Sequence, residues 1–133
     1  MSAERITYLD SSAIVKLAAE EPESAVLRQF LRRRHRLASS ALAQTEVARA
    51  LREDGPVAVQ RGWEVLQTVN LIRVNDRVLA LAGELLPVEL RSLDAIHLAT
   101  AQLLGKELGR VVTYDERMAE AARVLGMRVA SPS

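Results

Sequence analysis

Short apolar runs alternate along the chain with longer segments in which apolar residues recur every three or four positions. Short runs predict buried strands, and recurrence at helical spacing predicts helices that pack on one side. Strands are predicted at residues 6–9, 36–38, 71–74, 111–113 and 127–129. Helices are predicted at residues 12–19, 23–33, 40–53, 57–68, 77–86, 92–104 and 116–125.

The alternation of strands and helices predicts an α/β fold. Such an order is typical of a three-layer α/β/α sandwich around a mostly parallel central sheet, here of four to five strands. Boundary residues agree with this division: Ser40 is placed to cap the third helix, Pro56 follows Gly55 at a break, and Gly126 ends the last helix. With 133 residues and no internal repeat, we expect a single domain over residues 1–133.

Two aspartates follow predicted strands. Asp10 ends the apolar run at 6–9, and Asp115 comes shortly after the run at 111–113. Ligands of open parallel sheets bind beyond the carboxyl ends of the strands, so the two carboxylates approach each other if their strands are neighbours. Either one can also be an ordinary helix N-cap. For Asp10, the serines at 11 and 12 are able to take over that capping role.

Two further acids lie on predicted helices. Glu46 sits on the border of an apolar helix face, where it either points inward or pairs with Arg49 in solvent. Asp94 lies in the first turn of a strongly apolar helix, where it is either a functional group or a partner of the helix dipole, a role for which Ser92 competes. We expect His97 to be partly buried and bonded to a backbone carbonyl or to Asp94, outside the site.

Composition restricts the chemistry. Hydrophobic residues make up 49% of the chain and charged residues 26%, as in a compact globular protein. The chain has no cysteine and two histidines, which excludes disulfides, thiolate nucleophiles and the usual structural zinc sites. Any metal therefore depends on oxygen ligands, which favours Mg²⁺ or Mn²⁺.

The charge distribution suggests phosphate recognition. The net charge is +1, but if the four acids form one cluster, the other thirteen acids face eighteen basic residues, sixteen of them arginine. Arginine binds phosphate through a planar fork, so the run Arg32, Arg33 and Arg34 is a candidate RNA contact, although such a run is also typical of a solvated helix end. No apolar stretch is long enough to span a membrane, and residues 1–5 lack the apolar region of a secretory signal. We expect a cytoplasmic protein.

Four stretches carry a resemblance to a known family: YLDSSAIVKL, ALAQTEVARAL, LRSLDAIHLATA and VVTYDERMAEAARVLGMRV. In this order and spacing, across essentially the whole chain, they resemble the PIN-domain ribonucleases of the VapC toxin type. The resemblance implies a PIN-like fold and an endoribonuclease that hydrolyses phosphodiester bonds of single-stranded or loop RNA with Mg²⁺ or Mn²⁺. It assigns catalysis and metal binding to Asp10, Glu46, Asp94 and Asp115, and a supporting role to Ser12 and Thr113.

The resemblance also implies partners. Members of the family are toxins of type II toxin–antitoxin systems, commonly form homodimers, and are silenced by a VapB-type antitoxin. Val15, Leu27 and Leu31 on the early helices would suit such contacts if they are exposed, whereas burial in the core explains them equally well.

Three other functions compete with this interpretation. A phosphatase of the haloacid dehalogenase type needs a second aspartate two residues after Asp10, and that position is Ser12. A receiver domain needs a lysine after a late strand, and none follows Val112. The third alternative is a catalytically silent PIN-like module that serves in binding or assembly.

Overall fold

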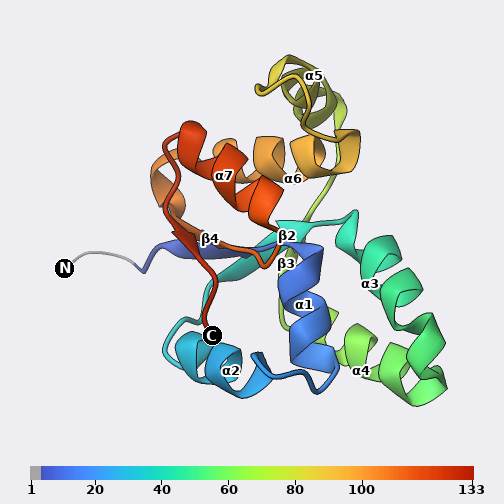
Figure 1. The fold of residues 1–133 in the computed structure, drawn as a ribbon. Coiled ribbons are helices and arrows are strands. Elements are labelled where there is room, and N and C mark those ends of the chain that lie inside the picture. Colours follow the sequence, from blue (N-terminus) through green and yellow to red (C-terminus); the bar gives the residue numbers. More distant parts are fainter. Residues whose placement is uncertain (1–3) are drawn as a thin grey trace.

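A parallel sheet forms the middle layer of the protein (Figure 1). The computed structural model describes residues 4–133, and its five strands lie in the order β3-β2-β1-β4-β5, with every pairing parallel. The α/β/α sandwich that the alternation predicts is thereby confirmed. The strands are β1 (Ile6–Leu9), β2 (Leu37–Ser40), β3 (Asn70–Ile72), β4 (Leu108–Val112) and β5 (Val129–Ala130).

Helices cover both faces of this sheet (Figure 1). The first four lie on one face, α6 and α7 lie on the other, and α5 packs on the outer side of α6. Each predicted helix is present, with ends that differ by a few residues. The helices are α1 (Ser11–Ala18), α2 (Ser24–Leu31), α3 (Ala43–Leu51), α4 (Pro56–Leu66), α5 (Asp76–Glu84), α6 (Ser92–Gln102) and α7 (Glu116–Val124).

The central strands are buried on both faces. Successive side chains of a strand point to opposite sides, so Leu9 packs among the early helices, whereas Tyr8 packs against Ala101 of α6. Leu27 is fully buried and Leu31 is 8% exposed, and both belong to the core beneath α1–α4. Core packing, and not a partner surface, therefore explains these two leucines.

The second strand differs from expectation at both ends. It runs from Leu37 to Ser40 and not over 36–38, because Ser39 and Ser40 continue the ladder as buried polar residues that no apolar pattern reveals. The prediction that Ser40 caps α3 is wrong. Its hydroxyl accepts the amide of Leu42 in the turn after the strand, and α3 begins at Ala43 without a side-chain cap.

The register of β1 and β4 determines where the loops meet. Leu9 pairs with Val112, so the residues that follow them, Asp10 and Thr113, leave the sheet side by side at its carboxyl edge. The two strands are thus the neighbours that the approach of Asp10 and Asp115 requires. Across residues 4–133, the helices are too short and too polar to cross a membrane.

Candidate active site

Asp10 is a buried carboxylate held by two hydroxyls. It is 3% exposed and caps α1, since Oδ1 accepts the Ala13 amide at 3.0 Å. The hydroxyl of Ser12 also donates to Oδ1, at 2.7 Å, and that of Thr113 donates to Oδ2, at 2.5 Å. The expectation that a serine frees Asp10 from capping is therefore wrong, because Ser12 and Thr113 instead hold the carboxylate itself. Burial raises the pKa of Asp10, and these donors oppose the rise.

Glu46 reaches the same region from α3. Its side chain is 25% exposed. Oε1 accepts the hydroxyl of Ser11 at 2.6 Å and lies 2.7 Å from Nε2 of His97. Partial burial would raise the pKa of Glu46, but the hydrogen bonds from His97 and Ser11 outweigh it and lower the pKa. Glu46 thus points inward and does not pair with Arg49.

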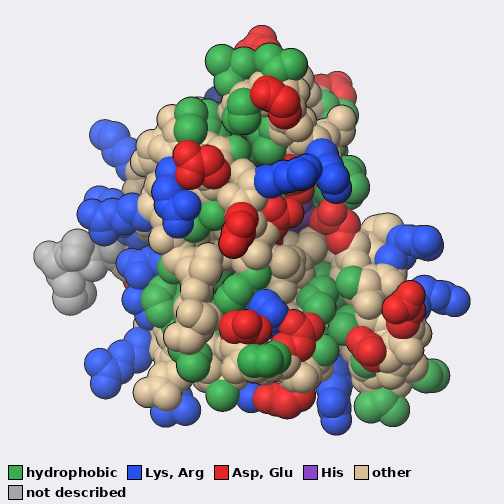
Figure 2. All heavy atoms as spheres, viewed as in Figure 1, with side chains coloured by type: hydrophobic (Ala, Val, Ile, Leu, Met, Phe, Trp, Pro, Cys, Tyr) green, Lys and Arg blue, Asp and Glu red, His purple; other side chains and the backbone are tan. Residues whose placement is uncertain are grey.

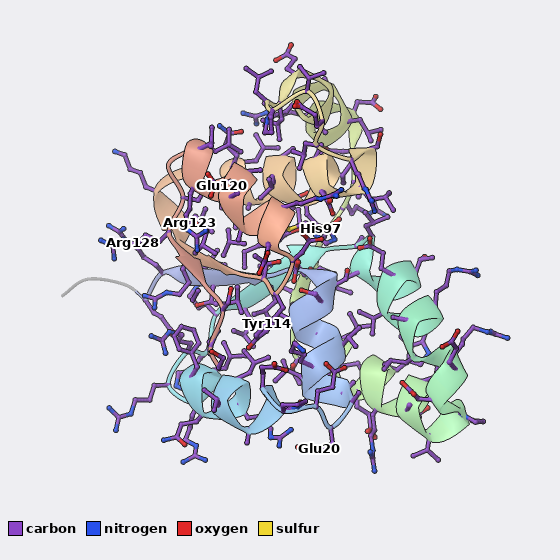
Figure 3. The ribbon with its side chains drawn as sticks, viewed as in Figure 1. Glu20, His97, Tyr114, Glu120, Arg123 and Arg128 are labelled. Carbon is purple, nitrogen blue, oxygen red and sulfur yellow. The ribbon has the colours of Figure 1, made fainter. Side chains whose placement is uncertain are left out.

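His97 is buried and hydrogen-bonded, as the sequence predicted, but with other partners. It lies on α6 with 1% exposure, between that helix and the region of α1 (Figure 3). Its partners are Glu46 through Nε2 and the Tyr8 hydroxyl through Nδ1, at 2.7 Å each, and not Asp94 or a backbone carbonyl. The Ser11 hydroxyl is also within 3.3 Å of Nε2. The three-residue spacing from Asp94 indicated a nearby acid, but only the tertiary fold, in which α6 covers the sheet face that carries Tyr8, brings Tyr8 and Glu46 to the ring.

Asp94 and Asp115 form the outer part of the site. They line a cavity of about 360 Å³ together with Arg91, Glu116 and Arg117. Ser92 does not compete with Asp94, because α6 begins without a side-chain cap. Asp115 does cap α7, since its Oδ1 accepts the amides of Arg117 and Met118 at 2.9 and 3.2 Å. The capping alternative thus holds for one oxygen of Asp115.

The four acids share one electrostatic environment. Burial first, and then the charge of Asp115, raise the pKa of Asp94. His97 opposes the rise, and the charges of Asp10 and Glu46 add to it. Acidic side chains gather where α1, α3, α6 and α7 approach one another, with basic side chains beside them (Figure 2). Like charges brought together in a partly buried site favour either protonation or a bound cation.

These carboxylates suit a hard divalent cation, although they do not surround one completely. Within residues 4–133, no three acidic or histidine side chains are close enough together to hold a metal by themselves. Mg²⁺ keeps several of its waters and is usually held by one or two carboxylates together with substrate phosphates, so it does not require an all-protein cage. Carboxylate oxygens without any sulfur ligand fit Mg²⁺ and Mn²⁺ better than the softer metals.

The arginine run lies away from these acids. Arg32, Arg33 and Arg34 follow α2 and precede β2, so they stand at the amino edge of the parallel sheet, whereas Asp10 stands at its carboxyl edge. Arg33, Arg34 and Arg110 line a small cavity at this amino edge, and the Arg34 guanidinium lies 3.8 Å from the centre of the Phe30 ring. The basic side chains beside the acids are instead Arg91 and Arg117.

Comparison with known proteins identifies the family. Residues 7–124 match the PIN domain. The chain belongs to the PIN-domain family. It is 62% identical over 126 residues to ribonuclease VapC46 of Mycobacterium tuberculosis, an alignment that covers 95% of this chain and 97% of that protein.

Two solved structures resemble this PIN domain. VapC20 of M. tuberculosis, a toxin that cleaves the sarcin–ricin loop, superposes with a TM-score of 0.73 at 15% identity, over 86% of this chain and 94% of that one. A toxin–antitoxin complex from Klebsiella pneumoniae gives a TM-score of 0.67 at 25% identity, over 96% of this chain and 98% of that one. The first likeness shows the fold alone. Together with the VapC relatives, the findings favour a toxin endoribonuclease over a silent binding module.

Proposed function

We propose that this PIN domain is a Mg²⁺- or Mn²⁺-dependent endoribonuclease, the toxin of a VapBC-type pair, contained in one domain over residues 1–133. The observation that carries the proposal is the convergence of Asp10, Glu46, Asp94 and Asp115 at one edge of the sheet, although they come from four different elements. The charges of the other three acids act on the partly buried Asp94 and help to raise its pKa. The extensive identity with a named ribonuclease supports the same reaction class.

Asp10, Glu46, Asp94 and Asp115 are the residues from which the cation would take its one or two carboxylate ligands, with water and substrate phosphate completing the shell. In phosphodiester hydrolysis a divalent cation supplies a more acidic water and neutralises charge that develops on the phosphate. Asp10 suits this role because Ser12 and Thr113 fix both of its oxygens in place before a ligand arrives. Asp115 keeps Oδ2 available, since both of its capping bonds use Oδ1.

The side chains around the acids would position the RNA. Arg91 and Arg117 line the same cavity as Asp94 and Asp115, so they can bind phosphates next to the scissile one. Arg32, Arg33 and Arg34 stand at the opposite edge of the sheet and would contact only a more distant part of an RNA molecule. We therefore expect neutralisation of Arg91 and Arg117 to weaken cleavage more than neutralisation of the run at 32–34.

A salt titration separates these two sets of arginines. Log affinity falls with log salt by roughly 0.7 per phosphate contact to single-stranded nucleic acid, so each lost contact flattens the slope by about that amount. RNA binding by Arg91→Gln with Arg117→Gln should show a flatter slope than the wild type. A slope that changes only on neutralisation of Arg32 to Arg34 would move the RNA path to the amino edge.

The proposed reaction has a direct test. Purified protein is incubated with a mixed RNA pool in Mg²⁺, in Mn²⁺ and in chelator, and the 5′ and 3′ ends of the products are mapped. We expect internal cleavage that requires the metal and is lost in Asp94→Asn. Cleavage that persists in this variant or in chelator would indicate a contaminant or a different site. A binding module would retain RNA and yield no products.

A VapB-type antitoxin and a second copy of the chain are the proposed protein partners. The antitoxin is supported by the likeness to a toxin–antitoxin complex from K. pneumoniae. With Leu27 and Leu31 in the core, partner contacts must use other apolar side chains, and Val88 at 84% and Leu86 at 60% exposure are available near the start of α6. Sedimentation of the chain alone and with the antitoxin tests both partners. A monomer at all concentrations would exclude the homodimer.

A further inference from the structure

Glu46 differs from the other three acids in being bonded to a buried ring. His97 is 1% exposed and Tyr8 is fully buried, and they form a continuous chain from the interior to the site: Tyr8 hydroxyl to His97 Nδ1, then His97 Nε2 to Glu46 Oε1, at 2.7 Å each. The two rings lie edge to face, with centroids 5.9 Å apart and planes at 78°. The proposed reaction gives neither ring a role so far.

The distances determine how hydrogen atoms are arranged along this chain. A bare ring nitrogen 2.7 Å from a carboxylate oxygen would place two lone pairs against each other, so Nε2 carries a hydrogen and donates to Glu46. In the neutral ring Nδ1 is then an acceptor, and the Tyr8 hydroxyl donates to it. The Glu46 carboxylate, which can only accept, thus fixes the tautomer, and the Tyr8 hydroxyl, which can rotate to donate, satisfies the acceptor at Nδ1 that this tautomer leaves in the interior.

We propose that His97 and Tyr8 are positioning residues that hold Glu46 in one orientation for the metal and the RNA, an inference that rests on the proposed function. Oε1 of Glu46 is engaged by His97 and by Ser11, which leaves Oε2 as the oxygen offered to the site. A carboxylate on a helix with free χ angles samples several directions. Two donors on one oxygen select one direction, in the way that outer partners fix metal ligands elsewhere.

The alternative is that the chain of hydrogen bonds serves only to satisfy a buried histidine. Both roles predict lower stability when His97 is changed, so stability cannot distinguish them. The two roles differ in whether the effect of a His97 change on metal affinity requires the Glu46 carboxylate. A double-mutant cycle measures this dependence, because residues that act through one another give non-additive losses.

The variants follow from the contacts. His97→Leu removes the donor, whereas His97→Gln retains an N–H near the position of Nε2. Tyr8→Phe removes one hydroxyl from a residue of the same shape. Tyr114→Phe is the matched control, since the Tyr114 hydroxyl donates to the Pro132 carbonyl and takes no part in the Tyr8–His97–Glu46 hydrogen bonds. The readout is Mn²⁺ affinity from the electron paramagnetic resonance signal of free Mn²⁺. Single-turnover cleavage is measured alongside.

Loss of outer partners typically costs about 10- to 100-fold in metal affinity. We expect a loss in that range for His97→Leu, a smaller loss for Tyr8→Phe, partial recovery in His97→Gln, and no change in Tyr114→Phe. In a Glu46→Gln background, His97→Leu and Tyr8→Phe should add nothing further. If His97→Leu does not fold, the same comparison is made with Tyr8→Phe alone and with Tyr8→Phe combined with Glu46→Gln.

Two results would overturn the inference while leaving the proposed function intact. One is a folded His97→Leu or Tyr8→Phe protein that binds Mn²⁺ as the wild type does. The other is a loss of equal size with and without the Glu46 carboxylate, which would show that the rings act on the fold in general. A wild type that neither binds Mn²⁺ nor cleaves RNA would instead overturn the proposed function together with the inference.

Discussion

Replacement of Asp94 by asparagine should change stability in opposite directions with and without metal. Burial and the charges of Asp115, Asp10 and Glu46 raise the pKa of Asp94, so its ionised form is unfavourable in the folded protein at neutral pH. An amide of nearly the same shape removes that repulsion. In chelator, Asp94→Asn should therefore melt at a higher temperature than the wild type.

With metal the order should reverse. At a free Mn²⁺ concentration of 100 times the dissociation constant, binding stabilises the folded wild type by about 2.7 kcal/mol. For a chain of this size, 1 kcal/mol corresponds to roughly 3–5 °C, so the wild type should gain about 10 °C. A tenfold weaker site in Asp94→Asn would lower the stabilisation to about 1.4 kcal/mol and the gain to roughly half.

The assay is a pair of thermal unfolding curves in chelator and in Mn²⁺ for each protein. Asp76→Asn is the matched control, because Asp76 is also an aspartate in the first turn of a helix but is exposed and lies on α5. It should show the full Mn²⁺ shift. Equal shifts in wild type and Asp94→Asn would refute the assignment of Asp94 to the metal, and a less stable variant in chelator would refute the repulsion argument.

Two further predictions concern pH and the core. Because the folded pKa of Asp10 is raised, its neutral form favours folding. In chelator, the stability of the wild type relative to Asp10→Asn should be greatest below the unfolded pKa of about 3.9. It should fall as pH rises through the higher folded pKa. Urea midpoints across this range measure the difference, and a difference that does not vary with pH contradicts the sign. Leu27→Ala should cost about 2–5 kcal/mol in urea unfolding, as expected for a fully buried leucine. Val26→Ala, at a neighbouring position that is 44% exposed, should change the free energy of unfolding by no more than about 0.5 kcal/mol. Equal losses for the two variants would place Leu27 outside the core.

Elements with a strong local signal were predictable from the sequence. Strand β1 has the predicted bounds, residues 6–9, and every helix with apolar residues at helical spacing is present. Strand β2 was the weakest prediction because Ser39 and Ser40 are polar in type yet buried in the sheet. Burial of a polar residue depends on its neighbours in space, so no periodicity records it.

The candidate site also combines features that the sequence shows with features that depend on the fold. The four acids were recognisable as residue types at unusual positions, since a carboxylate beside an apolar run is costly wherever the run is buried. Their roles as caps depended on local geometry: both Asp10 and Asp115 accept helix amides, although serines were available next to Asp10. Short-range competition of this kind is decided by the local backbone and side-chain geometry and not by residue type.

Contacts between distant residues required the tertiary structure. His97 is 51 residues from Glu46 and 89 from Tyr8 along the chain. The hydrogen bonds that join them exist because α6 packs on the sheet face to which Tyr8 points, where Glu46 of α3 reaches the ring. Residue types and their spacing were enough to predict the fold class and to single out the four acids as candidates, because these depend on local pattern and chemistry. Only the tertiary structure decided how Glu46 is oriented and that the arginine run lies at the opposite edge of the sheet from the acids. Strand order and helix packing determine which residues meet.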